Sequence, residues 1–190
     1  MMDQSQRWKY HALSPLKWLE SADVLRACAE RIGAAFVEDI LTPHPPVERT
    51  TEDVPPLMFG PTFQMLAGYS IEALLKGILI IRQPIPATAD KLPRWLTTHD
   101  LEGLLNRVSV TLDDPLLDFV HRAHVAVVWS GRYPAPKSAA NMGFKLSSSA
   151  DLDFFRDIYE RLAVLLQGEL RRADSTNKEM DRDERRRLCP

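Results

Sequence analysis

The chain has 190 residues, which is enough for one domain, and 45% of them are apolar, which excludes disorder over the whole chain. The formal net charge is −2, so the protein lacks the overall basic field that dominates DNA binding, and any nucleic-acid contact requires a local patch. Neither G-x-x-x-x-G-K-[ST] nor G-x-G-x-x-G occurs, which excludes the usual phosphate-binding loops.

The N-terminal segment is polar. Residues 1–10 include Arg7 and Lys9, and no apolar run follows them, so we expect no signal peptide. The longest apolar run, around Ile78–Ile81, is flanked by Lys76 and Arg82 and is too short for a membrane span. We therefore expect a cytoplasmic protein that does not enter a membrane.

Two long helices are predicted in the first half of the chain. The first begins at Pro15 and ends at Leu41, because apolar residues recur at steps of three and four and proline is tolerated in a first turn. Residues 42–57 hold five of the fourteen prolines and are expected to form a long loop. The second helix is expected from Met58 to Arg82, and it should be buried because it is apolar on nearly every side.

Three further helices are predicted in the second half. A proline-rich loop at 83–93 precedes a short helix at 100–108, and a helix at 113–129 opens with two acidic residues and a proline, which suit a first turn. Residues 130–149 are rich in Gly, Pro, Ser and Ala and are expected to form a loop, followed by a last helix at 150–172. No alternating apolar and polar run indicates a strand.

These elements predict an all-α fold, an antiparallel bundle of about five helices in a single domain over residues 1–173. Residues 174–190 carry many charges of both signs and are expected to form a flexible tail. Of the two cysteines, Cys28 is expected to be buried in a helix and Cys189 to be a free thiol near the last residue. No CxxC pair occurs, so we expect no structural zinc, and we expect no other metal or cofactor.

Three segments in order resemble one family. Residues 69–79 (YSIEALLKGIL) place a Glu-x-x-x-Lys step within an apolar helix, residues 99–105 (HDLEGLL) form a His-Asp-Leu-x-x-Leu-Leu helix, and residues 131–134 (GRYP) form an Arg-Tyr-Pro turn. Together they resemble the HEPN superfamily (higher eukaryote and prokaryote nucleotide-binding) over residues 60–170. The resemblance implies a HEPN-like helical bundle with a nucleotide- or RNA-associated function.

In HEPN ribonucleases, an arginine at this turn is followed four to six residues later by a histidine that acts as acid or base. By resemblance, Arg132 is the arginine, and it is expected to bind phosphate together with Tyr133 and Lys137. Residues 137–139 are Lys, Ser and Ala, so the histidine is missing. Arg94 and His99 show a similar spacing, but they lie before a different helix. The resemblance and the missing histidine together predict a non-catalytic protein.

Two alternatives remain open for the charged residues on the helices. Glu72 and Lys76 lie four residues apart and share one helical face, so they form either an ion pair at the bundle rim or part of a groove that binds a nucleotide. His99 has either a capping or hydrogen-bonding role, or it lies beside a binding cleft. His121 and His124 are three residues apart and are expected to be structural rather than metal ligands.

Three functions follow from these expectations. The first is a non-catalytic HEPN-like module that binds a nucleotide or RNA phosphate, a partner protein, or both, in a toxin–antitoxin or defence system. The second is a metal-independent HEPN-type ribonuclease with an altered motif, and the third is a structural helical dimerisation protein. The expected partners are a second copy of the chain, and a nucleotidyltransferase or antitoxin.

Overall fold

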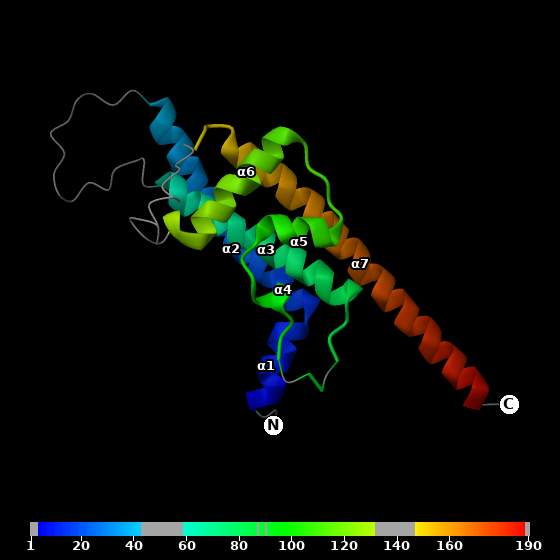
Figure 1. Ribbon diagram of the computed structural model, residues 1–190. Coiled ribbons are helices and arrows are strands. Elements are labelled where there is room, and N and C mark those ends of the chain that lie inside the picture. Colours follow the sequence, from blue (N-terminus) through cyan, green and yellow to red (C-terminus); the bar gives the residue numbers. More distant parts are fainter. Residues whose placement is uncertain (1–3, 43–58, 87, 90, 132–146, 189–190) are drawn as a thin grey trace.

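The computed structural model describes residues 4–42, 59–86, 88–89, 91–131 and 147–188. The predicted all-α fold is confirmed: these residues form helices joined by loops and turns, and no strand occurs among them (Figure 1). In chain order the helices are α1 (Gln4–Leu13), α2 (Pro15–Leu41), α3 (Phe59–Arg82), α4 (Arg94–Thr97), α5 (Leu101–Val108), α6 (Asp114–Val125), the π-helical turn η2 (Ala126–Ser130) and α7 (Asp151–Leu188).

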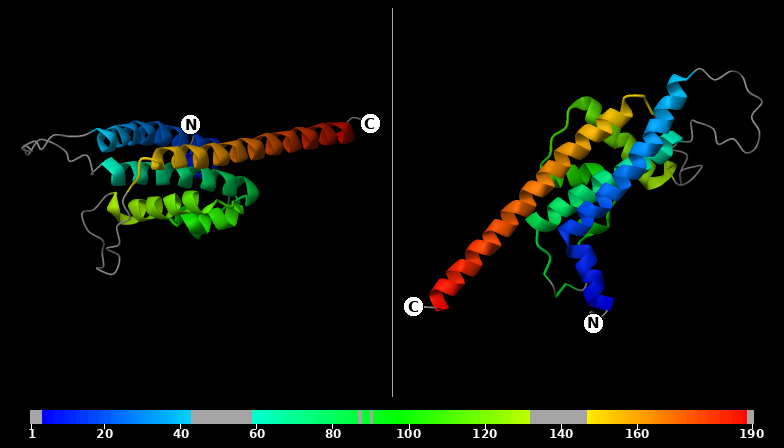
Figure 2. Two further views of the ribbon diagram at one scale, coloured as in Figure 1. Left: turned by 90° about the horizontal axis from the view of Figure 1, so that it is seen from above. Right: turned by 180° about the vertical axis from the view of Figure 1, so that it is seen from behind.

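The bundle has three layers, and α3 forms the middle one. Seen from above in Figure 2, α2 and α7 lie on one side of α3, and α5 and α6 lie on the other. Because α3 contacts helices on both sides, its side chains are buried nearly all round, as its composition predicts. The core includes Phe63, Leu74 and Ile78 of α3, all of them fully buried.

The composition of α3 also suits a membrane span. An 18-residue window of this helix has a mean hydropathy of 1.4, and 78% of that window is buried inside the bundle. The core helix of a helical bundle has this same composition, because neighbouring helices cover it on every side. Within the part of the chain that the structure describes, α3 is the one helix that is long and apolar enough to cross a membrane.

Helix α2 approaches α3 closely because small residues line its buried stripe. A side chain in place of Gly33 would bring its Cβ within 2.9 Å of the Phe63 ring, so only glycine fits this contact. The buried stripe is narrow, and Ile40 near the end of α2 is exposed. The prediction of a buried Cys28 is wrong, because Cys28 lies beside this stripe on the outer surface of α2 and is exposed.

The helix predicted over 113–129 changes its geometry before it ends. It is α-helical to Val125 and then widens into η2, where the turn packs against α3. The approach depends on Gly68 of α3, since a Cβ at this position would lie 2.6 Å from a methyl group of Val127. π-helical turns are rare and occur often at functional sites.

Three other elements differ from the prediction. Helices α1 and α4 were not expected: α1 is polar, and α4 has only four residues, which is too short for a periodic pattern. The last helix was expected to end at Arg172, but α7 continues to Leu188 and projects from the bundle (Figure 1). The helix continues because residues 173–188 contain no glycine or proline and include many strong helix formers.

Candidate functional site

Glu72 and Lys76 form a buried ion pair on α3. Lys76 Nζ lies 2.6 Å from Glu72 Oε1, and the two side chains are 7% or less exposed. The predicted pairing is therefore found, but the pair is inside the bundle rather than at its rim. Two charges at this depth stabilise each other only through close contact and further hydrogen bonds, because water does not reach them.

His99 supplies the second hydrogen bond of Glu72. Its Nδ1 lies 2.9 Å from Glu72 Oε2, and because a carboxylate only accepts, Nδ1 carries the proton. The imidazole is 47% exposed and meets the edge of the Tyr69 ring, with the ring centres 5.7 Å apart. Nε2 has no hydrogen-bond partner among the described residues, so it is available to a ligand.

Local structure holds His99 in this place. The side chain of Asp100, not that of His99, caps α5 by accepting a hydrogen bond from the backbone of Gly103 at 3.0 Å. The expected capping role of His99 is therefore wrong, and the expected hydrogen-bonding role is found. His124 Nδ1 also lies 3.1 Å from the backbone oxygen of His99, which ties this residue to α6.

Lys76 also has a neighbour outside this pair, Trp18 of α2. Its ammonium lies 5.6 Å from the centre of the Trp18 ring on α2, a distance that allows a cation–π contact. We call Tyr69, Glu72, Lys76 and His99 the His99 cluster. Trp18 connects this cluster to the N-terminal helices.

The other predicted phosphate-binding residues, Arg132, Tyr133 and Lys137, lie outside the described residues. Gly131, the last residue before them, packs against Met65, since a Cβ there would lie 2.5 Å from Met65 Cβ. Met65 is four residues before Tyr69 on α3, which is about 6 Å along the helix axis.

The two histidines of α6 have protein partners. His121 Nε2 lies 3.1 Å from Glu102 Oε1, and His124 contacts the backbone as described above. Over the described ranges, no group of three or more His, Cys, Asp or Glu side chains is arranged to hold a metal ion.

A second polar cluster, which was not predicted from the sequence, lies near the start of α3. Arg122 Nη2 lies 2.6 Å from Asp151 Oδ1, and Asp151 also accepts hydrogen bonds from Gln64 and Ser148. Asp118 pairs with the same guanidinium, while Arg122 Nε is buried without a partner in the described structure. This cluster joins α3, α6 and the start of α7 through one arginine and two carboxylates.

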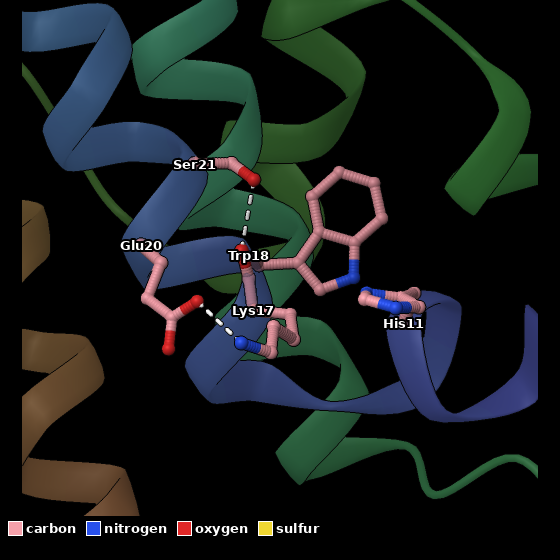
Figure 3. A pocket seen from close by; sticks show the side chains of 5 residues that line it. All are labelled: His11, Lys17, Trp18, Glu20 and Ser21. Atoms are coloured by element: carbon pink, nitrogen blue, oxygen red, sulfur yellow. Dashed lines mark hydrogen bonds and ion pairs between the residues drawn. The ribbon is translucent and has the colours of Figure 1, made fainter. Parts of the chain in front are cut away.

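An open pocket of about 410 Å³ lies where α1 meets α2. Figure 3 shows its five lining residues, with the Trp18 ring directed toward His11 and the Lys17 ammonium toward Glu20. The fifth residue, Ser21, donates a hydrogen bond to the Lys17 backbone oxygen at 2.9 Å.

Of the six residues predicted to form the site, the structure brings Glu72, Lys76 and His99 together, and the other three lie outside the described part. Trp18 was not predicted as a neighbour of these residues because it lies on another helix. Tyr69 was not predicted because an aromatic residue in an apolar helix gives no separate signal of a site. Comparison with protein-family models, with curated proteins and with solved structures finds no match to this chain.

Proposed function

We propose that the chain is a non-catalytic HEPN-like module that binds the phosphate of a nucleotide or RNA at the His99 cluster. The observation that carries this proposal is the exposed imidazole of His99, held by a buried carboxylate that is itself neutralised by Lys76. The three sequence segments that resemble the HEPN superfamily support the same function.

The cluster suits an oxyanion for two physical reasons. With Nδ1–H fixed on Glu72, a proton on Nε2 gives a donor directed away from the carboxylate and toward a ligand. Lys76 offsets the charge of Glu72, so the carboxylate repels a phosphate less than an unpaired one would. The ring of Tyr69 beside the imidazole offers a surface on which a base could stack.

The experiment measures binding of a fluorescent single-stranded RNA and of a mononucleotide by the whole chain. His99→Ala is expected to weaken binding, whereas His121→Ala, a similarly exposed histidine paired with Glu102, should bind as the wild type does. Arg132→Ala is expected to cost about 1–3 kcal/mol of binding free energy, the scale of a hydrogen bond to a charged group, with little change in melting. Equal binding by all four proteins would contradict the proposal.

One observation favours a second function, a metal-independent ribonuclease. An imidazole paired with a carboxylate is the arrangement that general bases use, and His99 could replace the histidine missing after Arg132. The two functions need opposite states of Nε2: phosphate binding needs the proton on it, and base catalysis needs the lone pair. RNA cleavage in the presence of a chelator that is lost in both His99→Ala and Arg132→Ala would establish the ribonuclease.

We also propose that the module works as a homodimer or with a nucleotidyltransferase or antitoxin. Leu16 and Val24 of α2 and Val164 of α7 are between 56% and 65% exposed, and exposed apolar side chains of adjacent helices favour association. Light scattering across micromolar concentrations tests the dimer, and a monomer throughout that range would rule it out.

A further inference from the structure

The pocket between α1 and α2 is lined by residues that the proposed phosphate site does not use. Its volume of about 410 Å³ lies within the range of roughly 300–1,000 Å³ that is common for small-molecule sites. Trp18 is the one apolar residue among its described lining residues. His11 lies beside the indole ring, and Lys17, Glu20 and Ser21 lie toward the Trp18 backbone (Figure 3). This combination of a flat apolar surface with a few polar groups is typical of ligand pockets.

The indole of Trp18 is held in place by the protein. Its Nε1 donates to the backbone oxygen of Ala12 at 2.9 Å, so the one polar group of the ring is already satisfied. The Cβ of Trp18 lies close to Gly77 of α3, and the Lys76 ammonium lies 5.6 Å from the ring centre. With its N–H already bonded, Trp18 can contact a ligand only through its ring, and flat rings stack on one another in an offset arrangement.

Two nitrogen donors of the pocket, on Lys17 and His11, suit an anionic ligand. Lys17 Nζ lies 2.6 Å from Glu20 Oε2, but this pair is exposed, so it contributes little to stability and its lysine can turn to a ligand. The hydrogen bond that Lys17 donates to Glu20 raises the pKa of the lysine, so the amine stays charged at neutral pH. His11 adds a second nitrogen donor on the opposite side of the pocket.

We infer that this pocket binds a small planar aromatic molecule that carries an oxyanion, with its ring on Trp18 and its oxyanion on Lys17 and His11. Two sources have this chemistry, an aromatic acid and a mononucleotide. Lys76 of the His99 cluster contacts Trp18, but none of the described residues that line the pocket belongs to that cluster. The inference therefore goes beyond the proposed function and can hold or fail without it.

Calorimetric titration of the whole chain with indole-3-acetate and with adenosine monophosphate distinguishes the two sources. Adenosine has the ring without the oxyanion, and inorganic phosphate has the oxyanion without the ring. Each should bind more weakly than adenosine monophosphate, which has both. Lys17→Met should weaken binding about tenfold, the loss of one charge-assisted hydrogen bond. Glu20→Gln should strengthen it by freeing the lysine. Lys178→Met, which removes another exposed lysine paired on its own helix, should leave it unchanged.

The Trp18 indole N–H resonance, assigned by its loss in Trp18→Phe, locates the ligand and should shift on binding in the wild type and in His99→Ala. If Trp18→Phe does not fold, the lysine and glutamate variants still decide the question. The inference is overturned if neither complete ligand binds at concentrations up to about 1 mM. It is also overturned if Lys17→Met binds as the wild type does, or if adenosine binds as tightly as its monophosphate.

Discussion

Lys76 carries a charge in the middle layer of the bundle, where a single substitution has a large effect. Its partner Glu72 is also buried, and the only exposed member of the chain of contacts is His99. Removing one member of a buried pair leaves the other charge without compensation, whereas removing both leaves only a change in packing. The stability of the fold and the position of His99 therefore depend on the same two side chains.

Replacing this lysine tests that dependence. Lys76→Met is expected to lower the free energy of unfolding by about 3–5 kcal/mol, because Glu72 would remain buried without its main counter-charge. The double variant Glu72→Leu/Lys76→Met should recover much of the loss. Urea denaturation measures both, and Lys178→Met, in an exposed pair, should stay within about 1 kcal/mol of the wild type. A loss of that small size in Lys76→Met would show that the pair is not buried in solution.

Tyr159 makes stability depend on pH in the alkaline range. Burial raises the pKa of its phenol above the usual value of 10.0, and the hydrogen bond that the phenol donates to Asp23 raises it further. The folded protein therefore holds this proton more tightly than the unfolded chain does. Tyr159 contributes its full stabilisation at pH values below the pKa that its phenol has in the unfolded chain. This stabilisation is lost as pH rises from that value through the higher pKa of the folded protein. Denaturation is compared at pH 9 and pH 11.5, about 1 unit below and about 1.5 units above the usual tyrosine pKa. The free energy of unfolding should decrease less for Tyr159→Phe than for Tyr10→Phe.

Helices stabilise the fold through close packing against one another as well as through their length. Along α3, glycine allows α6 and η2 to pack against the backbone at Gly68, whereas Gly168 on α7 has no atom within 4 Å of a potential Cβ. Gly68 is therefore needed for packing, and Gly168 is not. Comparing alanine at the two positions separates the steric effect of an added methyl group from its effect on helix propensity.

Two alanine substitutions measure the difference. Gly168→Ala is expected to raise the free energy of unfolding by up to about 1 kcal/mol, because alanine loses less backbone entropy in a helix. Gly68→Ala is expected to lower the free energy of unfolding by about 1–3 kcal/mol. The new Cβ would lie 2.6 Å from a methyl group of Val127, and the branched valine side chain cannot easily turn away. Thermal melting of both variants checks the signs, and stabilisation by Gly68→Ala would contradict the close approach of η2 to α3.

At the scale of the whole molecule, α7 has two parts with different environments. Up to Leu166 its side chains complete the core, and Glu169 pairs with Arg82 of α3 at 2.8 Å. Beyond the bundle the helix projects alone, and the described side chains after Ala173 are exposed (Figure 1). A helix without neighbours relies on its own propensity and on pairs such as Lys178 with Asp174.

Truncation separates these two parts. A chain ending at Ala173 is expected to unfold with a free energy within about 1 kcal/mol of the full chain, because the residues removed bury little surface. A chain ending at Leu165 should unfold readily, since it loses Leu166 from the core and the pair of Glu169 with Arg82. Urea denaturation followed by circular dichroism compares them, and a large loss on cutting at Ala173 would show that the projecting helix folds back on the bundle.

The long, periodic helices could be predicted from the amino-acid sequence alone. The bounds of α2 and α3 agree with the prediction within one residue, and the contact between Glu72 and Lys76 follows from their spacing on one helix. These features depend on residues near one another in the chain. Periodicity therefore contains the information needed to predict them.

Contacts between residues that are distant in the sequence could be assigned only from the folded structure. His99 is 27 positions from Glu72, and they meet because α5 packs on α3, which no local pattern specifies. Cys28 is exposed because α2 contacts the bundle along only a narrow stripe. The pocket lined by Trp18 forms where α1 meets α2. In each case the deciding quantity is which faces of separate helices cover one another. That depends on the packing of the whole bundle, to which each helix contributes only one surface.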